Sequence, residues 1–306
     1  MRIGVTARGS TVEEIVEHAQ WAEAQGFGSV WYSSATAGDP VVAMALAGRA
    51  TSSIELGTAI LQTYPCHPLL QANRVAAAAA GMGRPGFTLG IGPSHEQLIR
   101  GLYGLSYDHP GRNTEEYVGI LTALLRNEPV DFDGKDWTVH TPAGVALAHP
   151  VPVLVGAMSP RLLRVAGSMA DGTVSYLASE KVLESRVVPQ LQQAAAQAGR
   201  PMPRIVAGIP VAVHDDVGEA RHAFASYSTM FGSLTNYTRV LTEGGHGSAA
   251  DAAIVGNEAS VSAKLRSLID AGATDIWAGI FPVGDDPAVS LRRTTDLLGQ
   301  LAVEAA

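Results

Sequence analysis

The sequence predicts a (β/α)8 barrel, the TIM-barrel class of α/β fold, formed by residues 1–306 as a single domain. Two observations support this prediction. Short β-type runs alternate with helical stretches from one end of the chain to the other, and eight such runs are present. The first run lacks the G-x-G-x-x-G turn that is typical of a doubly wound dinucleotide-binding sheet, so that arrangement is the second choice.

The first half of the chain contains four expected strands, each followed by a helix. Thr11 and Glu14 have the spacing of a capping box at the start of the first helix, and Gly26 ends that helix. The expected strands are 2–7, 29–32, 54–61 and 87–92, and the helices after the first are 39–50, 68–80 and 95–126.

The second half repeats this alternation. Ser159 and Pro160 are the residue types preferred at a helix cap and at its first turn, Asn257 caps a later helix, and Gly272 ends it. The expected strands are 152–157, 172–178, 205–214 and 275–281, and the helices after the one at Ser159 are 180–198, 257–270 and 287–301.

Two stretches exceed the simple repeat and are expected as insertions after strands four and seven. Residues 130–141 resemble a hairpin around Asp133-Gly134. Residues 224–253 are rich in Gly, Ser and Tyr, which fits either a mobile lid or an irregular surface loop.

Composition excludes several classes of function. A net charge of −8 and a sequence pI near 5.6 give no attraction to nucleic acid or anionic membranes, and no apolar run is long enough to span a bilayer. The first residues read as a strand rather than a signal peptide, and the single cysteine, Cys66, excludes an internal disulfide framework, so we expect a cytoplasmic protein.

The histidines show no metal-binding spacing, so no metal site is expected. The low charged fraction of 16% favours a homodimer over a monomer.

Barrel enzymes carry their functional residues at the carboxyl ends of strands and in the loops that follow. A small-molecule substrate site is therefore expected at these ends. The rule selects Arg8, Ser33, Ser34, residues 58–63, residues 90–95, residues 156–159 and Tyr176.

The run Gly156-Ala157-Met158-Ser159 leads from an expected strand into a capped helix. Such a loop offers free backbone N–H groups and the positive end of the helix dipole, which suits a phosphate group. An ordinary structural turn with exposed arginines would give the same sequence, and the spacing alone does not separate the two readings.

The run Gly90-Ile91-Gly92-Pro93-Ser94-His95 ends the fourth strand with little side-chain bulk, so a flat ligand can approach its backbone. His95 at the rim is the one candidate for proton transfer, because an imidazole changes its charge near neutral pH. Its alternative role is to cap the helix that follows. Tyr64, Tyr103, Tyr176 and Trp277 are candidate walls of the site, or simply packing residues.

Several segments taken together resemble the bacterial luciferase-like monooxygenase superfamily over nearly the whole chain. These segments occur in the family's order and comprise Gly26-Phe27-Gly28-Ser29-Val30-Trp31, Leu56-Gly57-Thr58-Ala59-Ile60 with His67-Pro68, Gly83 to Pro93, Val153-Leu154-Val155-Gly156-Ala157 with Ala170-Asp171-Gly172, and Gly256-Asn257-Glu258. The segment Gly90-Ile91-Gly92-Pro93 resembles the corresponding segment in the branch of this superfamily that uses the deazaflavin coenzyme F420.

The resemblance implies a cofactor ring at the carboxyl end of the barrel. It places a non-prolyl cis peptide bond at Ala59–Ile60 behind the ring, and the cofactor phosphate at residues 156–159. Cofactor-binding residues implied in this way or selected by the strand-end rule are Ser33, Ser34, Thr58, Ala59, Ile60, Thr63, Gly92, Pro93, Ser94, His95, Gly156, Ala157, Met158 and Ser159.

The chain departs from the family after the second strand. Many relatives carry an acidic residue and a histidine just after the tryptophan, whereas this sequence reads Trp31-Tyr32-Ser33-Ser34-Ala35. Either His95 or the substrate handles the proton, or the protein binds the cofactor without turnover. We therefore expect an F420-dependent oxidoreductase that transfers hydride to or from a small organic substrate. The alternatives are an FMN-dependent monooxygenase and a non-catalytic flavin- or deazaflavin-binding protein.

Overall fold

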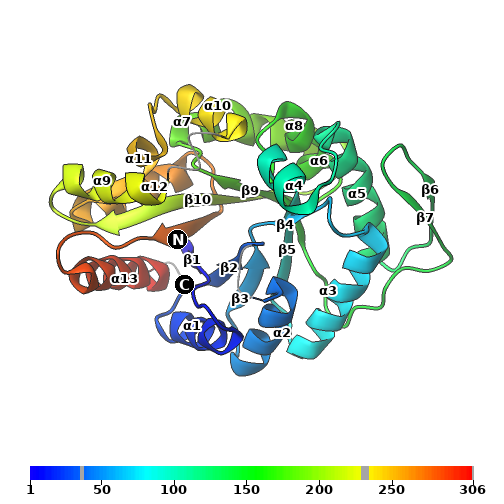
Figure 1. The fold of residues 1–306 in the computed structure, drawn as a ribbon, viewed down its shortest axis with the longest axis horizontal. Helices are drawn as coiled ribbons and strands as arrows, with labels where there is room; N and C mark the ends of the chain where they lie inside the picture. The colour runs from blue at the N-terminus through cyan, green and yellow to red at the C-terminus, as the bar shows by residue number, and fades with distance from the viewer. Residues whose placement is uncertain (35–37, 229–233, 305–306) are drawn as a thin grey trace.

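The computed structural model describes residues 1–34, 38–228 and 234–304, and in it a closed barrel of parallel strands is surrounded by helices (Figure 1). The predicted fold class is confirmed. Around the barrel the strands run β1 (Arg2–Thr6), β2 (Ser29–Tyr32), β3 (Glu55–Thr58) with β4 (Leu61–Gln62), β5 (Phe87–Gly92), β8 (Val153–Val155), β9 (Gly172–Tyr176), β10 (Arg204–Val213) and β12 (Asp275–Ile280), which pairs with β1.

Helices cover the outside of the barrel between successive strands (Figure 1). The expected caps are present, since Thr11, Ser159 and Asn257 each accept a hydrogen bond from a backbone N–H of the first turn. The main helices are α1 (Val12–Ala24), α2 (Pro40–Ala50), α3 (Pro68–Met82), α5 (Pro110–Leu125), α6 (Pro160–Ser168), α8 (Val188–Gln197), α12 (Glu258–Asp270) and α13 (Pro287–Val303). In the described part of the chain, no helix combines the length and apolarity needed to cross a membrane.

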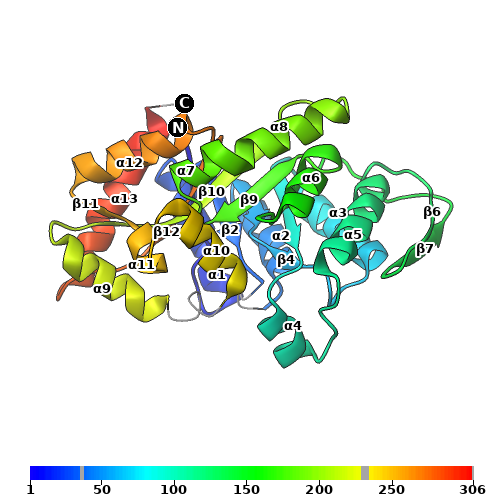
Figure 2. The ribbon, with the colours of Figure 1, turned by 90° about the horizontal axis from the view of Figure 1, so that it is seen from above.

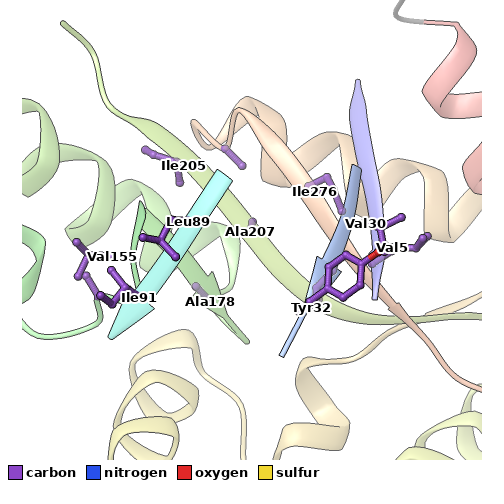
Figure 3. Close-up of a cluster of buried hydrophobic side chains, with 14 of the residues drawn as sticks. Val5, Val30, Tyr32, Leu89, Ile91, Val155, Ala178, Ile205, Ala207 and Ile276 are labelled. Carbon is purple, nitrogen blue, oxygen red and sulfur yellow. The ribbon is translucent and has the colours of Figure 1, made fainter. Parts of the chain in front are cut away.

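The side chains that point outward from the strands form the main core. Val5, Val30, Leu89, Val155 and Ile276 come from five different strands and lie buried beneath the helices (Figure 3). Because successive side chains of a strand point to opposite faces, the intervening residues fill the barrel interior.

Four element predictions needed correction. The helix expected at 95–126 is two helices, α4 (Glu96–Tyr103) and α5, because Gly104 adopts φ 64° and Pro110 starts a new helix. Figure 2 shows α4 projecting from the body of the barrel. The third strand is interrupted between β3 and β4. The helix expected at 180–198 consists of α7 (Glu180–Val182), one π-helical turn (Leu183–Val187) and α8. An unpredicted strand, β11 (Ile254–Gly256), pairs with β10.

Both insertions are present. Residues 130–141 form the expected antiparallel hairpin of β6 (Val130–Asp133) and β7 (Thr138–Thr141), which projects from the barrel (Figures 1 and 2). The second insertion is largely helical rather than irregular. It contains the end of α9 (Val217–Tyr227), then α10 (Thr235–Gly244) and α11 (Ala249–Ala252), and its residues 229–233 lie outside the described residues.

Charged side chains close the amino-terminal end of the barrel. Arg204 donates to both carboxylate oxygens of Asp275, at 2.6 and 2.9 Å, and to Glu55 at 2.7 Å, while Arg2 pairs with the same two carboxylates. The Arg204 guanidinium also lies over the Trp31 ring, 5.6 Å from its centroid. Burial alone lowers the pKa of Arg204, but its hydrogen bonds to Asp275 and the charge of Glu55 outweigh this and raise it above its ordinary value.

Candidate active site

Two tryptophans fill the barrel interior. A Cβ atom added at Gly57 would lie 2.5 Å from the ring of Trp31, and one added at Gly208 would lie 2.4 Å from the ring of Trp277, so both rings point inward between strands. Leu154, Val174 and Val206 pack with Trp31. Because these rings fill the interior, a ligand of the barrel is expected at the carboxyl-end mouth.

The junction between β3 and β4 forms part of this mouth. The peptide bond Ala59–Ile60 is cis, as expected from the resemblance, and both residues are half-buried. The Thr58 hydroxyl donates to the Gly90 carbonyl at 2.7 Å and accepts from the Gly90 N–H at 2.8 Å. The Thr63 hydroxyl donates to Asn113 at 3.0 Å in a buried setting. Both threonine hydroxyls are therefore used to hold neighbouring segments together.

Gly92 and Gly156, from two separate segments, converge on Ile60. A Cβ atom added at Gly92 would lie 3.5 Å from the side chain of Ile60 and 3.5 Å from the Gly156 carbonyl. One added at Gly156 would lie 3.3 Å from Ile60. Larger residues at either glycine would fill the space next to Ile60, so the two glycines and Ile60 form a low, apolar cradle at the mouth. Pro93 beside Gly92 is buried.

The loop Gly156-Ala157-Met158-Ser159 leads from β8 into α6. The Gly156 N–H donates to the Ile91 carbonyl at 2.8 Å, and the Ser159 hydroxyl caps the helix by accepting from the Leu162 N–H at 3.3 Å. The start of α6 therefore lies beside the cradle, as an anion site requires.

The arginines near this loop are engaged with other protein groups. Arg161 is turned to Glu115, with Nε to Oε2 at 2.7 Å, so its charge is already paired. Arg239 on α10 instead donates to the Met158 carbonyl at 3.1 Å. Sequence reasoning missed Arg239 because it comes from the insertion after the seventh strand, where no strand-end rule applies.

Ser94 and His95 lie between β5 and α4, at the carboxyl end of the barrel. Ser94 has φ 63°, its carbonyl accepts from the Tyr107 hydroxyl at 2.7 Å, and its hydroxyl accepts from Gln62 at 3.3 Å. His95 occupies the cap position of α4, but its side chain makes no capping hydrogen bond. Burial lowers the pKa of His95, so its imidazole is mainly neutral at pH 7.

Aromatic rings form one wall of the mouth. The ring of His95 lies 5.1 Å from that of Tyr237 on α10, Tyr237 lies 6.1 Å from Tyr176, and Tyr176 lies 5.2 Å from Trp277. Burial raises the pKa of Tyr237 to about 12. Tyr176 and Trp277 thus lie together as candidate wall residues, whereas Tyr64 stacks on Tyr107 and Tyr103 is 44% exposed on α4.

Ser33 and Ser34 follow β2 at the same end of the barrel. Ser33 is half-buried and Ser34 is exposed. Ala35, the last residue of the run that lacks the family's histidine, lies outside the described residues.

A packed parallel barrel with glycines, a helix start and aromatic side chains at its carboxyl-end mouth has the architecture of a barrel enzyme. The model of the luciferase-like monooxygenase family matches residues 2–292, and the chain belongs to this family. It is accordingly an oxidoreductase.

The proteins that this chain resembles include one whose name contains coenzyme F420 and one whose name contains FMN. The chain is 27% identical over 311 residues to the 5,10-methylenetetrahydromethanopterin reductase of Methanolobus tindarius, which covers 92% of this chain and 94% of that protein. Its fold matches the coenzyme F420-dependent tetrahydromethanopterin reductase of Methanopyrus kandleri, with a TM-score of 0.77 and 20% identity over 99% of this chain and 98% of that one. It also matches the FMN-bound oxygenating constituent of 3,6-diketocamphane monooxygenase from Pseudomonas putida, with a TM-score of 0.76 and 18% identity over 98% and 97%.

Proposed function

We propose that this protein is an F420-dependent oxidoreductase that transfers a hydride between coenzyme F420 and a small organic substrate. The observation that carries the proposal is the cradle of Ile60, Gly92 and Gly156 beside the start of α6. A flat ring suits the cradle, and a phosphate suits the helix start. The match to the coenzyme F420-dependent tetrahydromethanopterin reductase of Methanopyrus kandleri supports F420 as the cofactor.

The residues of the mouth have distinct roles in this proposal. Ala59 and Ile60 support one face of the ring, and residues 92–95 line its edge together with Ser33 and Ser34. Residues 156–159 bind the phosphate through backbone N–H groups, while Thr58 and Thr63 hold the strands that form the cradle. When bound, F420 supplies or accepts the hydride. The protein positions the two partners and keeps water away from them.

Two alternatives remain testable. An FMN-dependent monooxygenase has support from the fold shared with the FMN-bound diketocamphane enzyme. A non-catalytic flavin- or deazaflavin-binding protein has support from the absent histidine after Trp31. Titration of the purified protein with F420 and with FMN, followed by cofactor fluorescence, separates the first two functions. At least tenfold tighter binding of F420 is expected, and tighter binding of FMN would contradict the proposal. Tight F420 binding without oxidation of reduced F420 by any acceptor would indicate a binding protein.

Replacing Gly156 with valine is expected to weaken F420 binding by about tenfold or more. Its Cβ would lie 3.3 Å from Ile60, and the added methyl groups would fill the cradle. Gly119→Val on α5 is the matched control, because a Cβ at Gly119 meets nothing within 4 Å. Unchanged F420 affinity in Gly156→Val would place the cofactor elsewhere.

Replacing His95 with asparagine is expected to lower turnover by roughly 10²-fold or more, with F420 affinity nearly unchanged, because the imidazole would handle a proton. Burial lowers the pKa of His95, so the wild-type rate should depend on pH on the acidic side of the ordinary histidine range. If His95 donates the proton, the rate rises as the pH falls and imidazolium accumulates. If it accepts the proton, the rate falls over the same range. A pH profile of kcat that is the same in both proteins would remove His95 from the mechanism.

We also infer that residues 1–306 act as a single domain in a cytoplasmic homodimer. The neighbouring helices α2 and α3 carry the exposed apolar side chains Val42, Leu46 and Leu70, which are 54%, 48% and 56% exposed. Exposed apolar side chains of this kind can pack against the same side chains of a second copy across a two-fold axis. Sedimentation velocity should give a dimer for the wild-type protein and a monomer for Leu46→Glu, whereas a monomeric wild type would contradict the inference.

A further inference from the structure

The geometry points to Arg8 as the receptor for a carboxylate on the substrate, an inference that rests on the proposed function and specifies its substrate class. We propose that the hydride acceptor or donor is an organic carboxylate. Its anionic group pairs with Arg8, and its flat apolar part lies against Tyr176 and Trp277.

Arg8 lies at the rim of the mouth between the ends of β1 and β12. Its Nη2 donates to the carbonyl of Ile280, the last residue of β12. The N–H of the next residue, Phe281, donates to the carbonyl of Val211 on β10 at 3.3 Å. Because the N–H and C=O of a trans peptide point in opposite directions, the Ile280 carbonyl faces β1, and it fixes the guanidinium over the gap between the two strands.

The reacting end of the barrel is next to this position. Thr6, two residues before Arg8, accepts a hydrogen bond from the Trp277 indole at 2.9 Å. A Cβ atom added at Gly279, beside Ile280, would lie 3.6 Å from the Tyr176 hydroxyl. Arg8 therefore borders the same part of the mouth as Tyr176 and Trp277.

The charge of Arg8 is not compensated by the described protein. In residues 1–34, 38–228 and 234–304 no carboxylate forms an ion pair with it, and the residues outside these ranges include no Asp or Glu. The Arg8 side chain reaches solvent, but the protein around it removes part of its hydration, and this burial lowers the pKa of the guanidinium. His18 is a titratable neighbour of Arg8. Burial and the charge of Arg8 lower the pKa of His18 to about 4, so His18 is neutral at pH 7.

Three other arginines around the barrel are paired with carboxylates. Arg204 binds Asp275 and Glu55 at the far end, Arg161 binds Glu115, and Arg239 lies 3.9 Å from Glu243. A guanidinium carries five N–H donors in a planar fork, and Arg8 uses one nitrogen on a carbonyl. The remaining donors suit a carboxylate. The chain as a whole has a net charge of −8 and repels anions, so attraction of an anionic substrate depends on a local cation.

Benzoate and benzamide provide a matched probe pair, because they share shape and aromatic ring and differ in charge. Their binding to the full-length protein is measured by isothermal titration calorimetry, with and without saturating F420. The wild-type protein is expected to bind benzoate about tenfold or more tightly than benzamide, as a charge-assisted hydrogen bond implies. Arg8→Gln should abolish this preference by weakening benzoate alone, and Arg8→Lys should retain part of it. Arg221→Gln on the exposed face of α9 is the control and should leave both affinities unchanged.

Equal binding of the two probes by wild type, undetectable benzoate binding, or a benzoate preference that survives in Arg8→Gln would each overturn the inference. The last result would place the anion at another site, such as the start of α6. Thermal melting of each variant verifies that the fold is intact, and Arg8→Lys keeps the test valid if the glutamine variant does not fold. The F420 titration on the same preparations tests the proposed function separately, since the probe preference does not depend on the cofactor's identity.

Discussion

Replacing Arg204 with methionine is expected to lower the free energy of unfolding by about 3–5 kcal/mol. Glu55 and Asp275 are 8% and 2% exposed, and their carboxylates would lose the guanidinium that donates three hydrogen bonds to them. Arg2 would remain, but its side chain is 43% exposed and it lies 3.4 Å from Asp275. The change would also remove the cation above Trp31. Urea unfolding followed by circular dichroism measures the effect.

Arg293→Met is the matched control for this experiment. Arg293 also binds two carboxylates, Asp215 and Glu258, but these are 74% and 47% exposed. Solvent and salt screen such a pair, so the free energy of unfolding should change little. Similar losses in both variants would show that burial of the Arg204 cluster is not the source of its stability.

Replacing Gly90 with alanine is expected to destabilise the protein by about 3 kcal/mol or more, and to abolish cofactor binding with it. The added Cβ would lie 1.9 Å from the Thr58 carbonyl oxygen, a backbone atom that can move only with the strand. Moving it would break the paired hydrogen bonds between the Thr58 hydroxyl and the Gly90 backbone and displace Ile60. Urea unfolding and F420 titration report the two effects.

Gly92→Ala separates this close approach from a general effect of glycine replacement. Gly92 lies two residues along the same strand, so its Cβ would point to the same face, but its nearest neighbours would be 3.5 Å away. Its free energy of unfolding should fall by less than about 1 kcal/mol. Equal destabilisation by the two substitutions would contradict the steric explanation.

Local sequence signals predicted the elements well where a helix or strand has its own start and stop residues. Ser159, Pro160 and Asn257 mark the starts of α6 and α12, and the structure places those helices there. The single helix expected at 95–126 was wrong, because Gly104 ends α4 and Pro110 starts α5. The cis peptide bond at Ala59–Ile60 was predicted from the family resemblance rather than from periodicity.

The sequence by itself determined the fold class, the family resemblance and the strand ends at which a ligand is expected. These follow from short-range patterns and from an ordered set of motifs. Only the tertiary structure decided which polar groups are already used. Thr58 forms hydrogen bonds with Gly90, Thr63 with Asn113 and Arg161 with Glu115. Among the described residues, the one hydrogen-bond partner of the Arg8 guanidinium is the carbonyl of Ile280, 272 positions along the chain. A hydrogen bond or an ion pair depends on distances of a few ångströms between distant segments, and those distances exist only once the barrel has closed.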